Sequence, residues 1–176
     1  MNNKKLKEEF INSFGEDKWN QEEMLAKLIK PQKELCEYLG IDMIPVICDE
    51  IPEDSRYYFK EDYIVISPLM LESYTDALKS LVHEMRHQYQ YKCVHDPNTK
   101  ENPELVADWK KEFSSLKPLN QFDQESVNEY YSLFSELDAH AFSKWYLEWK
   151  YDIYTFHPNA VYDEIISRYS KIYFKK

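Results

Sequence analysis

Apolar residues recur at three- and four-residue steps near the start of the chain, and this period predicts helix. Pro31 lies inside the run and predicts a break or kink, because proline has no N–H to donate and its ring crowds the preceding turn. Gly40 is a typical helix end. We therefore expect residues 1–40 to be a helical N-terminal extension, with an apolar stripe of Leu25, Leu28, Ile29, Leu35 and Leu39.

The pattern changes between residues 43 and 67, where short apolar runs predict strands. Tyr63-Ile64-Val65-Ile66 is aromatic and β-branched, a composition that favours strands, and Ser67-Pro68 ends it. Pro45 restricts the first run to an edge strand or to a strand start. The segments expected to be extended are 43–50, 56–59 and 62–67.

Helical spacing returns after residue 68. A helix is expected from about Ser73 or Thr75 to about Tyr91, with Ser73 and Asp76 forming a capping box. The order of elements is helix, two or three strands, then helices, which predicts one α+β domain over residues 1–176, mostly helical, with a small early sheet. The later helices expected are 103–116, about 124–154 closed by Pro158, and about 160–173, with a loop at 118–123.

Composition excludes several classes of function. The net charge of −10 argues against a general nucleic-acid binder, which needs a basic surface. Only two glycines are present, so no glycine-rich phosphate loop can be written. No apolar run approaches the roughly 20 residues of a membrane helix, and no signal peptide is recognised. Three cysteines without a C-x-x-C pair favour reduced thiols, and hence a cytoplasmic protein.

The chemistry is concentrated in His83-Glu84-Met85-Arg86-His87. Histidines four residues apart share one helix face, and two neutral imidazoles there can bind one tetrahedral zinc. Glu84 is displaced by about 100° around the helix, so it can reach a metal-bound water without being a ligand. This arrangement predicts a zinc site with Glu84 as general base. The alternative is that His83 and His87 are surface histidines paired with Glu84.

A catalytic zinc usually has a third protein ligand. The extension H-E-x-x-H-x-x-G-x-x-H fails here, because Gln90 and Cys93 occupy its glycine and histidine positions. Cys93 could bind as a thiolate only if the helix turned sharply. The better candidate is Glu136, which lies 49 residues after His87 and beside small alanines that allow close helix approach. Its alternative role is that of an ordinary surface glutamate.

Neighbouring residues suggest supporting roles. His140 is one turn after Glu136 and could be a ligand instead, a residue that supports the ligands from behind, or a group that stabilises the transition state. Asp138 could orient a histidine through its ring N–H. Arg86 is expected to face away from the ligands and to pair with a carboxylate. A hydroxyl from Tyr130 or Tyr131 could stabilise an oxyanion, although ordinary packing is the commoner role of a tyrosine.

These two motifs carry a resemblance to a known family. The H-E-x-x-H helix followed by Glu136-Leu137-Asp138-Ala139-His140-Ala141-Phe142 resembles small bacterial and phage gluzincin-type metallopeptidases, above all the ImmA/IrrE-like proteins with their Glu-x-x-Ala-x-x-Phe helix. The resemblance implies a minimal zincin core and one zinc ion per chain, held by His83, His87 and Glu136, with Glu84 as base. It also implies a protein or peptide substrate. The longer spacing between the motifs and the lack of a helix-turn-helix module set this chain apart.

Two other kinds of site compete with a catalytic zinc. A di-iron carboxylate site needs a second Glu-x-x-His motif, and none exists beside Glu84-Met85-Arg86-His87. A non-catalytic metal-binding or protein-interaction module on the same fold remains the alternative. A structural zinc is usually closed by four protein ligands, whereas three good ones can be counted here, which favours catalysis.

Overall fold

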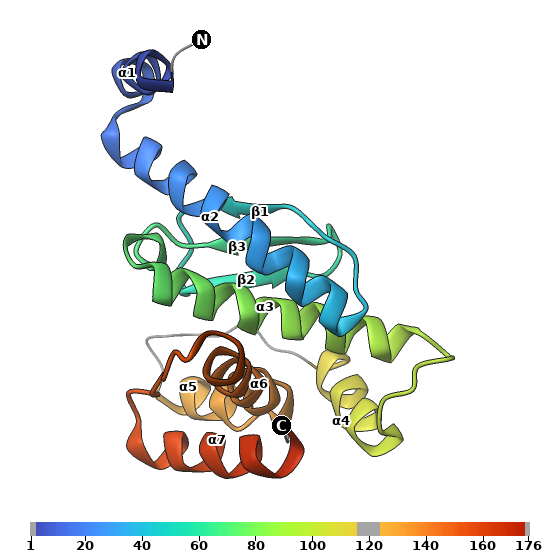
Figure 1. Ribbon diagram of the computed structural model, residues 1–176. Helices are drawn as coiled ribbons and strands as arrows, with labels where there is room; N and C mark the ends of the chain where they lie inside the picture. Colours follow the sequence, from blue (N-terminus) through green and yellow to red (C-terminus); the bar gives the residue numbers. More distant parts are fainter. Residues whose placement is uncertain (1–2, 116–123, 175–176) are drawn as a thin grey trace.

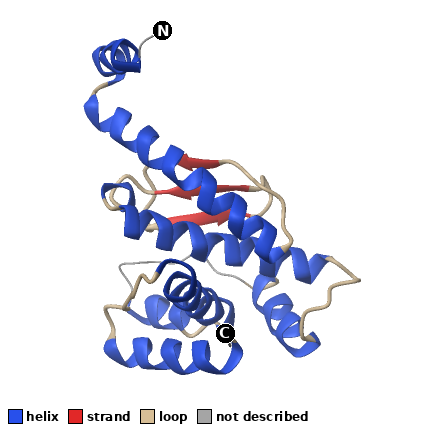
Figure 2. Ribbon diagram, viewed as in Figure 1, coloured by secondary structure: helices blue, strands red, loops and turns tan. Residues whose placement is uncertain are grey.

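The computed structural model describes residues 3–115 and 124–174. Helices make up most of this part of the chain and pack against one small three-stranded sheet (Figure 2). The predicted α+β class is therefore confirmed. Within the described ranges, no helix combines the length and the apolar character needed to cross a membrane.

The sheet contains β1 (Val46–Cys48), β2 (Ser55–Tyr58) and β3 (Tyr63–Ile66) in the order β1-β3-β2. β1 runs parallel to β3, with Val46 opposite Ile64, and β2 runs antiparallel to it, with Ser55 opposite Ile66. All three predicted strands are confirmed, although β1 is shorter than expected. β1 lies at an edge, as Pro45 requires.

The N-terminal region forms two helices, α1 (Asn3–Phe14) and α2 (Glu16–Leu39), which meet at Gly15 with φ 90°. Of the break or kink predicted at Pro31, the break is wrong, because α2 continues through this residue. Pro31 lies on the buried face of α2 with Leu28 and Leu35, and packing of that face offsets the missing hydrogen bond. Gly40 ends α2 as predicted, in the left-handed conformation with φ 66°. α1 lies beyond the sheet, at the far end of α2 (Figure 1).

A short 3-10 helix, η1 (Met70–Glu72), leads into α3 (Tyr74–His95), which is about one turn longer than predicted. Ser73 caps α3 as expected, because its side chain accepts a hydrogen bond from the backbone N–H of Asp76. α3 lies between the sheet and α6 (Phe134–Tyr151) (Figure 1). Its apolar face, including Leu78, Leu81 and Met85, belongs to the main core. The opposite face is thus available for polar residues.

The remaining helices are α4 (Pro103–Phe113), α5 (Gln124–Tyr131) and α7 (Ala160–Tyr173). α7 agrees with the prediction, but the single helix expected over 124–154 is wrong. The chain leaves the helix after Tyr131, resumes it at Phe134 and ends it at Tyr151. The loop expected at 118–123 lies outside the described residues.

The start of α6 is set by a residue from another helix. The Glu112 carboxylate of α4 accepts hydrogen bonds from the backbone N–H groups of Phe134 and Ser135, at 2.7 and 2.8 Å. These N–H groups would otherwise lack partners in the first turn of a helix, and a negative charge there is favourable. Glu112 therefore stabilises a new helix at the point where Glu136 is needed.

Candidate metal centre

α3 places His83 and His87 one turn apart on the side that faces α6. Their Nε2 atoms are 3.0 Å apart, and each side chain is only 12 % exposed. The core packing of Leu81, Val82 and Met85 fixes the rotation of the helix about its axis, which directs both imidazoles to the same place. The two histidines are therefore not surface residues.

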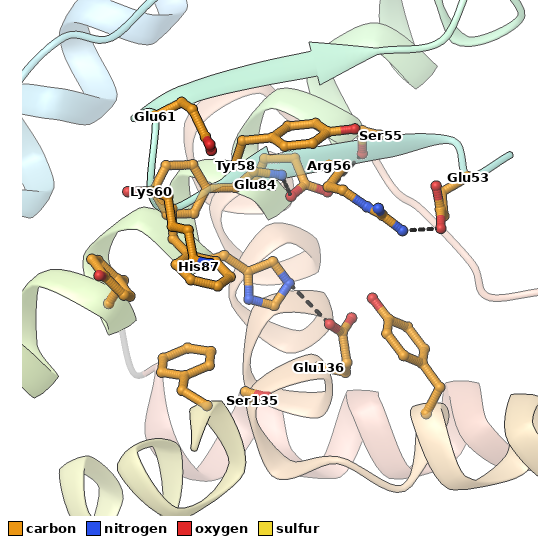
Figure 3. Close-up of a pocket in the computed structure, with 15 residues that line it drawn as sticks. Glu53, Ser55, Arg56, Tyr58, Lys60, Glu61, Glu84, His87, Ser135 and Glu136 are labelled. Atoms are coloured by element: carbon orange, nitrogen blue, oxygen red, sulfur yellow. Dashed lines mark hydrogen bonds and ion pairs between the residues drawn. The ribbon is translucent and has the colours of Figure 1, made fainter. Parts of the chain in front are cut away.

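Glu136 meets them from the first turn of α6. Its Oε2 lies 3.4 Å from His83 Nε2, and its Oε1 lies 3.2 Å from His87 Nε2. Figure 3 shows the His87 ring and the Glu136 carboxylate pointing toward one another across the pocket. Glu136 is 5 % exposed, so its alternative role as an ordinary surface glutamate is wrong.

The three side chains fit a divalent metal. Ligands about 2.1 Å from a tetrahedral zinc are separated from each other by about 3.4 Å. The three separations here, 3.0, 3.2 and 3.4 Å, are close to that value. In addition, Glu136 Oε2 is buried and accepts no hydrogen bond, although a buried polar atom normally has a partner. A metal ion among the three side chains would satisfy that oxygen.

Without a metal, the cluster is held together by an ion pair. Burial lowers the pKa of His87, but the Glu136 carboxylate outweighs burial and the pKa rises to about 9. Burial works to raise the pKa of Glu136, and His87 and His83 together hold it well below its usual range. A proton on His87 thus takes the place that a metal would occupy.

The Glu84 carboxylate is hydrogen-bonded to the sheet. Its Oε1 accepts a hydrogen bond from Ser55 Oγ at 2.8 Å, and its Oε2 accepts one from the backbone N–H of Tyr57 at 2.7 Å. Both donors lie on β2, so the strand fixes the position of the carboxylate beside the pocket (Figure 3). The alternative in which Glu84 pairs with His83 and His87 is wrong.

A cavity of about 440 Å³ opens in front of these groups, and Glu84, His87 and Glu136 all line it. β2, α3, α4, α5 and α6 contribute residues to its walls. Much of the lining is aromatic, which suits an apolar side chain, and two cationic residues, Arg56 and Lys60, also line it. The further lining residues include Arg56, Tyr57, Phe59, Tyr91, Phe113 and Tyr130.

Tyr130 brings a hydroxyl to this cavity. Burial, followed by the negative charges of Glu136 and Glu84, raises the pKa of this hydroxyl far above its usual range. Tyr130 therefore keeps its proton and can donate a hydrogen bond to an oxygen atom in the pocket. Tyr131 is not part of the lining of this cavity. Its ring packs 5.2 Å from that of His157 and 6.4 Å from that of His140.

His140 adds a fourth side chain. Its ring lies 4.4 Å from that of His83, and potential ligand atoms of His83, Glu136 and His140 lie within 4.8 Å of one another. Burial, and then the neighbouring His83, lower the pKa of His140 well below its usual range, so its ring is neutral. Both His87 and His140 are therefore near the Glu136 carboxylate, with His87 Nε2 at 3.2 Å from Oε1 and His140 within the 4.8 Å cluster.

Two other candidates take different positions. Cys93 stays on α3, which continues to His95, and six residues of helix carry it about 9 Å beyond His87. Asp138 does not orient a histidine directly, because it accepts hydrogen bonds from Arg86 Nε at 2.7 Å and Arg86 Nη2 at 3.1 Å. The predicted pairing of Arg86 with a carboxylate is confirmed.

Sequence reasoning missed the residue that contacts His87. Gln90 entered the sequence argument only as a missing glycine, yet it is fully buried and its Oε1 lies 2.9 Å from His87 Nδ1. The available signal was the three-residue spacing, which places the side chains of His87 and Gln90 side by side on a helix.

Comparisons of the chain with protein-family models, with curated proteins and with solved structures found no significant match. The resemblance to ImmA/IrrE-like metallopeptidases accordingly rests on the two motifs around His83 and Glu136.

Proposed function

We propose that this protein is a zinc-dependent metallopeptidase with a minimal zincin-like domain. His83, His87 and Glu136 hold one zinc ion, and Glu84 is the general base. The observation that carries the proposal is the meeting of two Nε2 atoms and one carboxylate within 3.4 Å, with Glu84 on the wall of the adjoining cavity. The free thiols of the three cysteines support a cytoplasmic location.

When bound, zinc would polarise the scissile carbonyl and make the attacking water more acidic. Glu84 uses one acceptor position on each oxygen to hold β2, and a carboxylate has about four such positions. It can therefore take a proton from water in the cavity and pass it to the leaving amine. Tyr130 can donate a hydrogen bond to the oxyanion that develops. The aromatic walls suit a peptide that carries an apolar side chain.

Glu84→Gln tests this proposal with little disturbance of the structure. The amide oxygen can still accept from the Tyr57 N–H, and the amide nitrogen can donate to Ser55 Oγ if that hydroxyl turns round. We expect the variant to bind zinc like the wild type and to hydrolyse peptides about 100-fold more slowly or worse. His83→Ala and Glu136→Ala should lose the zinc.

The assay uses a mixture of unstructured peptides analysed by mass spectrometry, together with zinc analysis of each purified variant. Hydrolysis by Glu84→Gln at the wild-type rate would remove Glu84 from the mechanism. Stoichiometric zinc in both His83→Ala and Glu136→Ala would refute the ligand assignment.

A non-catalytic metal centre is the second candidate, and His140 is the observation that favours it. Its position near His83 and Glu136 would let it serve as a fourth protein ligand and close the site. His140→Ala separates the two functions. A closed site predicts a large loss of zinc affinity in this variant and no hydrolysis by the wild type. A catalytic site predicts that zinc affinity is retained.

A further inference from the structure

Gln90 connects the two helices that carry the metal ligands. From α3, its Nε2 donates hydrogen bonds to the backbone carbonyl of Ser135 at 2.9 Å and to Asp138 Oδ2 at 2.7 Å, both on α6. Its Oε1 lies 2.9 Å from His87 Nδ1. The side chain is fully buried, so no solvent competes for these contacts.

These contacts fix the orientation of the amide group. A backbone carbonyl can only accept a hydrogen bond, so the atom of Gln90 that faces Ser135 must be the NH₂ group. Asp138, which is paired with Arg86, also requires a donor from Gln90. The amide oxygen is therefore the atom that faces His87.

The orientation of the amide in turn fixes the proton on His87. An amide oxygen only accepts, so His87 Nδ1 must carry the hydrogen. In a neutral imidazole the other nitrogen is then bare. That nitrogen is Nε2, the atom 3.2 Å from Glu136 and 3.0 Å from His83 Nε2. The lone pair of His87 thus points into the proposed metal centre.

We propose that Gln90 is a positioning residue for the metal centre. It holds His87 in the tautomer that ligates through Nε2, and it ties that histidine to the turn of α6 that presents Glu136. Its carbonyl partner, Ser135, immediately precedes Glu136 in the chain, so a single side chain fixes two of the three ligands. This assignment rests on the proposed zinc site.

The two histidines differ in whether their Nδ1 atoms have a hydrogen-bond partner. His83 Nδ1 is buried and has no hydrogen-bond partner among the described residues. On the side of the ring away from the site, His83 is therefore held by no hydrogen bond from the described part of the chain, whereas His87 is held by Gln90. Since residues that hydrogen-bond a ligating histidine typically change metal affinity by 10- to 100-fold, the loss of Gln90 should be measurable.

The experiment compares Gln90→Met with Gln88→Met. Methionine keeps the unbranched shape and removes the amide. Gln88 is a matched control, because it is also buried on α3 and donates a hydrogen bond to the backbone carbonyl of Asp42, at 2.9 Å. Zinc affinity is measured by competition with a chromophoric chelator. We expect binding about 10- to 100-fold weaker in Gln90→Met and wild-type binding in Gln88→Met.

A second measurement observes the protonation of the two His87 nitrogens directly. Long-range ¹H–¹⁵N spectra of the zinc-loaded wild type should show His87 coordinated through Nε2, with an Nδ1 proton protected from exchange. In Gln90→Met that proton should exchange rapidly. Coordination of His87 through Nδ1, or wild-type zinc affinity together with a protected Nδ1 proton in Gln90→Met, would overturn the role of Gln90. A wild-type protein that binds no zinc would instead overturn the metal centre itself.

Discussion

Arg86 is a cation enclosed in the protein interior, and replacing it should be costly. The residue is 4 % exposed, and its guanidinium lies 4.7 to 5.4 Å from the ring centres of Tyr89, Trp109, Phe142 and Phe174. Its partner, Asp138, is fully buried. Arg86→Met keeps much of the aliphatic volume but leaves the carboxylate without its counter-charge.

The magnitude follows from the remaining partners of Asp138. Removing one member of a buried ion pair usually costs about 3 to 5 kcal/mol. Asp138 would still accept hydrogen bonds from Gln90 Nε2 and Tyr169 Oη. Because these two donors compensate part of the lost charge, we expect Arg86→Met to lower the free energy of unfolding by about 3 kcal/mol.

Urea denaturation of the metal-free protein, followed by circular dichroism, measures this loss. The control is Arg168→Met, whose ion pair with Glu164 has side chains 75 % and 64 % exposed and should contribute less than about 1 kcal/mol. Equally small losses of stability in Arg86→Met and Arg168→Met would refute a large contribution from the buried ion pair. Adding Asp138→Leu to Arg86→Met should restore much of the stability, because an apolar pair of similar volume is tolerated. The double variant should nevertheless bind zinc more weakly, since Gln90 loses a partner.

Two further predictions concern pH and helix capping. In the metal-free protein the pKa of His87 is about 9, against about 6.5 in an unfolded chain, so its stabilising effect is fully present below pH 6.5 and disappears as the pH rises through 9. Zinc requires the unprotonated ring, and for a pKa of about 9 the unprotonated fraction of His87 rises about 50-fold between pH 7 and pH 9. Zinc affinity should therefore rise by about 50-fold over this range. Isothermal titration calorimetry at several pH values tests this, and a flat profile would contradict it. Glu112→Gln weakens the cap of α6, so it should lower the free energy of unfolding by about 1 kcal/mol, as measured by thermal denaturation. Zinc binding should also weaken, because Glu136 lies in the capped turn. Unchanged stability would show that solvent replaces the cap.

The elements that sequence predicts well are those whose signal is local. Tyr63-Ile64-Val65-Ile66 forms a buried central strand, and Ser73 caps α3, because composition and spacing within a few residues decide both. The division between α5 and α6 has no such signal. Apolar spacing continues across it, and the helix start is stabilised by Glu112, which is 22 residues away in the chain. At Pro31 the local signal is present but does not decide the structure. Packing of the buried face of α2 outweighs the hydrogen bond that proline cannot make, so the helix continues.

In the candidate site, too, only some features could be predicted from the sequence. The pairing of Arg86 with a carboxylate could be anticipated, because a cation on the far side of the motif needs a counter-charge. The anchoring of Glu84 by Ser55 and Tyr57 could not, since it depends on where β2 lies over α3. Two of the three contacts of Gln90, those with Ser135 and Asp138, reach α6, and only the folded chain brings these residues together.

The origin of the ligands on two helices has a consequence for folding. His83 and His87 come from α3 alone, so that helix offers two ligands even before the rest of the chain is in place. Glu136 arrives only when α6 docks. A bound ion would therefore act as a cross-link that closes a loop of 49 residues, and it would bind the native chain more tightly than any partly folded form. Zinc added during refolding should for this reason stabilise the docked state of α6, and its release should report when the two helices separate.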